Sequence, residues 1–71
     1  MYEFWLKRRG TTHEKFRAGA DLEKPSDVRK LMVDALARAK YPESRIGEFE
    51  LEIRDLRGRT VTTYVTAAGG R

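Results

Sequence analysis

The sequence predicts one α+β domain, with a single four-stranded mixed sheet and one amphipathic helix packed across one face of that sheet. Two observations carry this prediction. Apolar and polar residues alternate in four short segments, two near each end of the chain, as they do in half-buried strands. Between these pairs, the segment 26–41 repeats its apolar residues at helical spacing. The expected order is therefore strand, strand, helix, strand, strand.

The N-terminal hairpin is predicted from residues 2–7 and 13–18. In the first segment, apolar side chains occupy every second position from Tyr2 to Leu6, whereas Phe16 is the one large apolar residue of the second. Residues 9–12 hold a glycine and two threonines, which is typical of a turn. Because this connection is short, the two strands are expected to pair as a hairpin.

The helix is predicted to begin at Pro25-Ser26-Asp27, with the Ser26 side chain as its N-cap and an acidic residue in its first turn. It is expected to end near Tyr41, since Pro42 cannot continue a helix. One face carries a continuous apolar stripe that should cover the sheet, formed by Val28, Leu31, Met32, Ala35, Leu36 and Ala39.

The second hairpin is predicted from the alternating segments 48–54 and 61–66, joined by a type I turn from Asp55 to Gly58. Residues 67–71 have no side chain able to anchor them, so the domain is expected to span residues 1–66 and to be followed by a flexible tail. The sheet face turned away from the helix is expected to be mostly solvated and to carry Trp5, Lys7, Lys15, Arg17, Glu50, Glu52, Thr62 and Tyr64.

Composition excludes several classes of site. The chain of 71 residues has no cysteine, so it can form neither disulfides nor thiolate metal sites. Its formal net charge of +4 is compatible with an anionic partner without identifying one. No apolar run approaches the ~18 residues that cross a bilayer, and the first residues lack a signal-peptide pattern. We therefore expect a cytoplasmic protein without a membrane partner.

Enzymatic activity is not expected, because no nucleophile, base and orienting group can be assembled. His13 is the single imidazole and stands beside a glutamate at the start of a predicted strand, which is a common chance pairing. Ser26 is explained as a helix cap, and Ser44 falls in a predicted loop. The row of glutamates at 48, 50 and 52 is interpreted as solubilising, so neither a metal nor a cofactor is predicted.

A partner surface is conceivable around the basic run Lys7, Arg8 and Arg9, with Trp5 or Tyr64 as an aromatic platform. Nucleic-acid binding would require this run and the arginines at 54, 57 and 59 to converge on one face. Solvated surface charge is the favoured interpretation. For Trp5 two interpretations stay open, an exposed contact surface or a side chain covered by the loop 19–24.

Gly69-Gly70-Arg71 is the one segment with a specific mechanistic interpretation. A chain end that must thread a narrow enzyme channel to be adenylated cannot carry a Cβ, and glycine meets this requirement. The alternative is a frayed end, since flexible tails are rich in glycine.

The order of elements, the Pro25-Ser26-Asp27 helix start and Gly69-Gly70 after the last strand resemble ubiquitin-like β-grasp proteins. The short turn at 55–58 makes the chain more similar to compact bacterial members. This resemblance implies a bacterial protein modifier, activated by an E1-type enzyme and joined to protein targets. In that case Gly70 would be the conjugated residue, Gly69 its slim neighbour and Arg71 a cap that a processing peptidase removes.

The chain also resembles small bacterial α+β domains of unknown function, which share a final hairpin like Asp55-Leu56-Arg57-Gly58-Arg59. This second resemblance implies no activity. The alternative function is therefore a non-enzymatic interaction module of unknown partner, in which nucleic-acid binding through basic residues ranks below protein binding.

Overall fold

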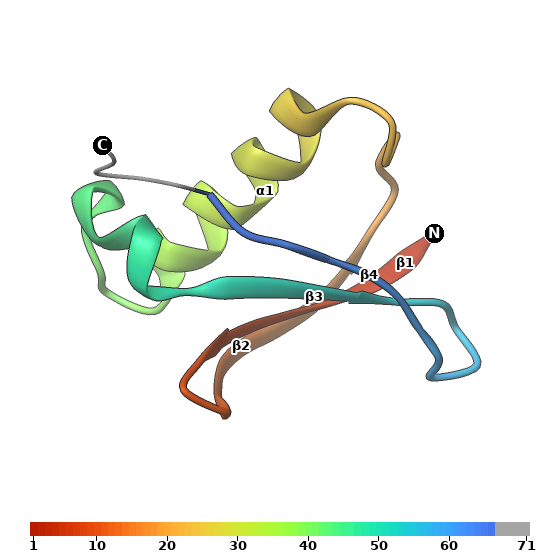
Figure 1. Cartoon of the computed structure of the whole chain (residues 1–71), viewed down its shortest axis with the longest axis horizontal. Coiled ribbons are helices and arrows are strands. Elements are labelled where there is room, and N and C mark those ends of the chain that lie inside the picture. Colours follow the sequence, from red (N-terminus) through yellow and green to blue (C-terminus); the bar gives the residue numbers. More distant parts are fainter. Residues whose placement is uncertain (67–71) are drawn as a thin grey trace.

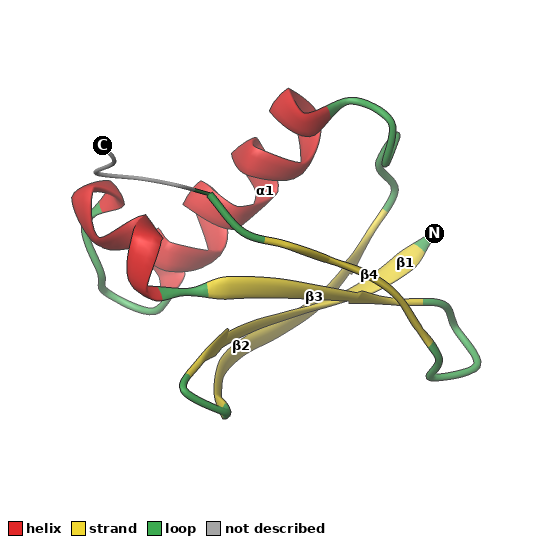
Figure 2. Cartoon of the chain, in the orientation of Figure 1, coloured by secondary structure: helices red, strands yellow, loops and turns green. Residues whose placement is uncertain are grey.

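A computed structural model describes residues 1–66 of the chain (Figure 1). Its elements follow the chain as β1 (Tyr2–Arg8), β2 (Thr11–Ala18), α1 (Pro25–Arg38), the 3-10 helix η1 (Glu43–Glu48), β3 (Glu50–Arg54) and β4 (Thr60–Tyr64). Both helices lie on one side of the sheet, and the two hairpin turns lie at its opposite ends (Figure 2). The predicted α+β class and the order of strands and helix are confirmed. The predicted tail, 67–71, lies outside the described residues.

The sheet is antiparallel throughout, so the predicted mixed sheet is wrong. The strand order is β2-β1-β3-β4, and all three neighbouring pairs run in opposite directions. The cause is the path from α1 through η1, which returns the chain to the end of β1, where Glu50 pairs with Lys7. From there β3 can only run back along β1. The tight second hairpin then places β4 at the edge of the sheet.

The hydrophobic core lies between the inner face of the sheet and α1. Phe4 and Leu6 of β1 sit opposite Ile53 and Leu51 of β3, and all four side chains are buried. Phe4 also stacks on Phe16 of β2, with ring centroids 5.1 Å apart. From the predicted helix stripe, the residues buried in this core are Val28, Met32, Ala35 and Leu36. The predicted inner faces of these strands and of the helix are therefore confirmed.

The first hairpin closes more tightly than the sequence predicts. Arg9 and Gly10 both have positive φ, 51° and 83°, as a two-residue type I′ turn requires. Strand β2 therefore begins at Thr11 rather than at His13. A bulge between the partners of Leu6 and Lys7 leaves His13 as the extra residue.

The helix begins and ends differently from the prediction. Lys24 is the N-cap and makes no side-chain cap, whereas Pro25 occupies the first turn, so Ser26 is not the cap. The helix ends at Arg38 rather than near Tyr41, because Lys40 turns the chain with a left-handed φ of 71°. The amide of Tyr41 donates to the Leu36 carbonyl at 2.9 Å, which completes a Schellman motif with Lys40 where glycine is usual.

Helix η1 replaces the loop that was predicted around Ser44. It is a short 3-10 helix whose Ile46 side chain is buried in the core. A single buried apolar residue gives no periodic signal, so this contribution to the core was not predicted.

In β4, the residues that were predicted on the outer face of the sheet lie on its inner face. Thr62 pairs with Ile53 and Tyr64 with Leu51, so both lie on the inner side of the sheet. Between the pairs Arg54–Thr60 and Ile53–Thr62, the register shifts by one residue at Val61. Because side chains alternate from residue to residue, this bulge reverses the face of every residue that follows it.

The turn before β4 is confirmed as type I. The amide of Gly58 donates to the Asp55 carbonyl at 3.0 Å, and Gly58 has φ 87°. The Asp55 carboxylate also accepts the amides of Arg57 and Arg59, at 2.9 and 3.0 Å. The aspartate therefore fixes the turn through its side chain as well as its carbonyl.

Candidate functional site

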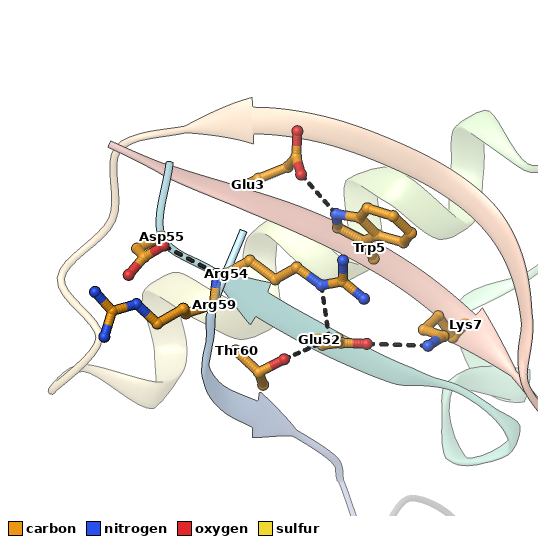
Figure 3. A network of polar contacts seen from close by, with 8 residues as sticks. All are labelled: Glu3, Trp5, Lys7, Glu52, Arg54, Asp55, Arg59 and Thr60. Carbon is orange, nitrogen blue, oxygen red and sulfur yellow. Dashed lines mark hydrogen bonds and ion pairs between the residues drawn. The ribbon is translucent and has the colours of Figure 1, made fainter. Parts of the chain in front are cut away.

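The outer face of the sheet gathers aromatic and charged side chains, and Figure 3 shows those of β1 and β3 together with Thr60 of β4. Trp5 stands at its centre, opposite Lys15 of β2 and Glu52 of β3. The same register brings Glu3 beside Arg17 and Arg54. We call this set the outer-face cluster, and it consists of Glu3, Trp5, Lys7, Lys15, Arg17, Glu52, Arg54 and Thr60. Apart from Thr62 and Tyr64, the predicted outer face is confirmed.

Trp5 lies between cations that come from the two strands flanking β1. The Arg54 guanidinium carbon is 3.8 Å from the ring centroid, and the Lys15 ammonium is 4.7 Å from it. The indole Nε1 donates to the Glu3 carboxylate at 2.9 Å. The ring is only half-buried.

The loop 19–24 does not cover Trp5. Its apolar residues, Ala20 and Leu22, pack against the core on the inner side of the sheet. The interpretation that loop 19–24 covers the ring is therefore wrong, and the side chains over the ring are those of Lys15 and Arg54.

The Glu52 carboxylate accepts hydrogen bonds from three other side chains of the outer-face cluster (Figure 3). The donors are Arg54 Nε at 2.7 Å, Thr60 Oγ1 at 2.7 Å and Lys7 Nζ at 3.0 Å. These donors, Arg54 first, lower the pKa of Glu52 from 4.5 to about 2. Only 12% of the side chain is exposed, so this glutamate is not the solvated position that the sequence suggested.

The cluster holds the four cations Lys7, Lys15, Arg17 and Arg54 against the carboxylates of Glu3 and Glu52, and most of these charges are paired. Glu3 receives the indole N–H and lies 3.6 Å from the Arg17 Nε. The Trp5 hydrogen bond is the main cause that lowers the pKa of the Glu3 carboxyl, helped by the charges of Lys15 and Arg17. With Glu52 and the neighbouring Glu50, the carboxylates almost match the cations on this face.

The predicted partner residues do not form one surface. Trp5 and Lys7 lie on the outer face, whereas Arg8 points to the inner side, 5.2 Å from the Tyr41 ring centroid. Arg9 is in the hairpin turn, and Tyr64 lies on the inner side of the edge strand.

The cations beside Trp5 are Lys15 and Arg54, and neither belongs to the basic run that was predicted as a partner surface. Strand alternation placed Lys15 on this face. Its contact with Trp5, and that of Arg54, depends on the register across β2, β1 and β3, which alternation within one strand does not reveal.

The two basic segments lie at opposite ends of the sheet (Figure 2). Arg9 lies in the β1–β2 turn, whereas Arg57 and Arg59 lie in the β3–β4 turn. The two segments therefore do not converge as a whole, although Lys7 and Arg54, one from each, meet at Glu52 on the outer face.

His13 belongs to an aromatic cluster at the end of the sheet. Its ring meets Tyr41 and Phe49 edge-on, each at 5.5 Å between centroids. Nearby, Arg45 donates twice to the Glu48 carboxylate, at 2.8 and 2.9 Å, and this hydrogen bonding lowers the pKa of Glu48. The contacts of His13 are packing contacts, with the rings closing the core beside η1.

Within residues 1–66, no group of three or more His, Asp or Glu side chains could hold a metal ion. In the same residues, no helix is long and apolar enough to cross a membrane.

Gly69, Gly70 and Arg71 lie outside the described residues. The last described residue, Thr66, accepts a hydrogen bond from Arg29 of α1 at 3.4 Å.

No protein-family model, curated protein or solved structure matches this chain.

Proposed function

We propose that this chain is a non-enzymatic protein-binding module of the cytoplasm that uses the outer-face cluster as its contact surface. The observation that carries the proposal is the half-buried Trp5 ring, held between Arg54 and Lys15 on an otherwise polar face. Tryptophan and arginine are the side chains most enriched at the energetic centres of protein interfaces. Both are preordered here, so a partner would lose little side-chain entropy on binding.

The balance of charge favours a protein over a nucleic acid as the partner. Lys7 and Arg54 already pair with Glu52, and Arg17 pairs with Glu3. A phosphate backbone would have to compete with these carboxylates for Lys7, Arg17 and Arg54. A protein surface can instead contact the indole and the solvent-exposed parts of the ion-paired side chains.

Replacing Trp5 is expected to abolish partner binding without unfolding the domain. In this experiment the wild-type chain and Trp5→Ala are immobilised and exposed to a cell extract, with and without nuclease. Leu56→Ala is the matched control, because Leu56 is 55% exposed but lies in the β3–β4 turn. We expect the same proteins to bind the wild type and the control, to be lost with Trp5→Ala and to be unaffected by nuclease. Far-UV circular dichroism checks that each variant is folded.

Two results would reject this function. Equal retention of proteins by all three chains would show that Trp5 is not part of a contact surface. Retention that depends on nucleic acid would assign the face to RNA or DNA instead.

A second candidate function is a ubiquitin-like protein modifier, conjugated through Gly70 after removal of Arg71. Two features support it, the strand, strand, helix, strand, strand order and the Gly69-Gly70 pair that follows β4. The antiparallel sheet differs from the mixed sheet that a β-grasp resemblance implies, so this candidate rests mainly on the glycine pair.

Intact mass of the protein recovered from its native cells tests the modifier function. We expect loss of the Arg71 mass, together with larger adducts in which the chain is joined to target proteins. Gly70→Ala adds one methyl group beyond the folded strands and should remove the adducts while leaving the unfolding midpoint unchanged. A single unprocessed species in cells, identical for wild type and variant, would exclude this candidate.

A further inference from the structure

The two edge strands of the sheet, β2 and β4, differ in how they are protected against the addition of another strand. At the β2 edge, Glu14 pairs with Arg38 of α1 at 3.5 Å, and the Arg38 guanidinium covers Phe16 at 4.8 Å from the ring centroid. Charged side chains at a sheet edge, such as Lys15 and Arg17, disfavour the addition of another strand.

The β4 edge carries none of these protections. Residues 60–66 contain no charged side chain, although 37% of the whole chain is charged. Val61 is 48% exposed and Val65, just beyond the strand, is 65% exposed. Within residues 1–66, β3 is the only strand beside β4, so the backbone groups on its outer side have no strand partner. Beyond the bulge at Val61, residues 62–66 form an uncharged edge rich in β-branched side chains, and such an edge is a template for strand addition.

We propose that β4 is the interface of a homodimer, in which the β4 strands of two copies pair antiparallel about a two-fold axis and join their sheets. A second copy fits this edge because its own β4 is equally uncharged. Pairing of two uncharged strands buries no unpaired charge, whereas pairing with a charged strand would bury one. A two-fold axis also brings the same patch of both copies together, as closed dimers require.

A shallow hollow beside β4 supports the pairing. It has a volume of about 120 Å³, and its lining is uncharged: Leu22, Pro25, Val28, Ile53, Thr62, Thr63 and Tyr64. In an antiparallel pair, residues directly opposite each other share a face. With the two-fold axis at Thr63, the inner-face Tyr64 of the second copy lies against Thr62 of the first, at the rim of this hollow. On the outer face, Thr63 meets Thr63 of the second copy across the axis.

Sedimentation equilibrium over graded concentrations tests the dimer. We expect the wild type to reach the dimer mass, and Thr63→Lys and Thr63→Glu each to weaken the association at least tenfold, because like charges then meet across the axis. Mixing the two variants in equal amounts should restore the dimer. Thr12→Lys is the control, since Thr12 is exposed on the same sheet face but on the β2 edge, and it should dimerise as the wild type does.

Circular dichroism distinguishes failure to pair from failure to fold. A wild type that stays monomeric at all concentrations overturns the proposal and leaves the edge to a different protein. The proposal is also overturned if Thr63→Lys and Thr63→Glu are folded but their equal mixture remains monomeric. It is overturned as well if Thr12→Lys weakens association as much as the Thr63 variants do.

Thr63 shares the outer face with the cluster and pairs with Glu52, so Trp5→Ala is sedimented as well. Trp5 lies on β1, two strands away from β4. A Trp5→Ala chain that still dimerises, beside a Thr63→Lys chain that does not, separates the dimer interface from the contact surface of the proposed function.

Discussion

Leu36→Asp is expected to unfold the domain. Leu36 is fully buried between α1 and the sheet, and an aspartate there would place an unpaired carboxylate in an apolar core that has no group to pair with it. We expect a loss of more than ~3 kcal/mol in the free energy of unfolding. A chain of this length has a total stability of roughly 4–10 kcal/mol, so this loss removes much or all of it. Urea titration followed by the fluorescence of Trp5 measures the change.

Ala37→Asp is the matched control, because it introduces the same side chain one position later on the exposed side of α1. Its expected cost is about 1 kcal/mol or less, from helix propensity and an acidic group near the helix C-terminus. Val33 is a poorer control, since it packs partly against the core. Equal destabilisation by Leu36→Asp and Ala37→Asp would contradict the assigned helix face.

Glu52→Gln is expected to have the second largest effect, a loss of roughly 2 kcal/mol at neutral pH. The amide keeps the shape of the carboxylate but removes the charge that accepts from Arg54, Thr60 and Lys7. Thermal or urea unfolding of both chains at pH 7 measures the loss. Thr12→Gln is a suitable control, because Thr12 lies on the same sheet face but is exposed on the β2 edge.

The same carboxylate predicts a pH dependence of stability. The pKa of Glu52 is lowered from 4.5 to about 2 in the folded chain. The unfolded chain therefore takes up the proton first, so the stabilisation is complete above pH 4.5 and is lost as the pH falls toward 2. The difference between wild type and Glu52→Gln should shrink over this window. A difference that stays constant from pH 7 to pH 2 would show that the charge of Glu52 is not its cause.

Local patterns were sufficient to predict most of the core. Alternation placed Phe4, Leu6, Leu51 and Ile53 on one face of their strands, and helical spacing placed Leu36 on the buried side of α1. These predictions succeed because burial acts on each side chain through the geometry of its own strand or helix. The type I turn at Asp55 was predictable for a similar reason, since its hydrogen bonds are formed within five consecutive residues.

Predictions failed where a single residue changed the face of a strand or the end of a helix, and where segments far apart in the chain met. The bulge at Val61 reversed the faces of β4 and removed Tyr64 from the surface that was expected to hold Trp5. The left-handed Lys40 ended α1 earlier than Pro42 would have done. Neither feature has a distinctive residue type, because valine is common in regular strands and lysine in helices.

The sequence by itself therefore determined the four strands and α1, their order and, except in β4, the side chains that each turns toward the core. Only the tertiary structure decided that β3 pairs with β1 antiparallel, that β4 becomes an uncharged edge and that Arg54, Lys15 and Glu52 converge around Trp5. The physical reason is that periodicity records how one segment meets an apolar environment. Strand pairing instead depends on the free energy of contacts between segments far apart in the chain, which several registers satisfy until the whole core is packed.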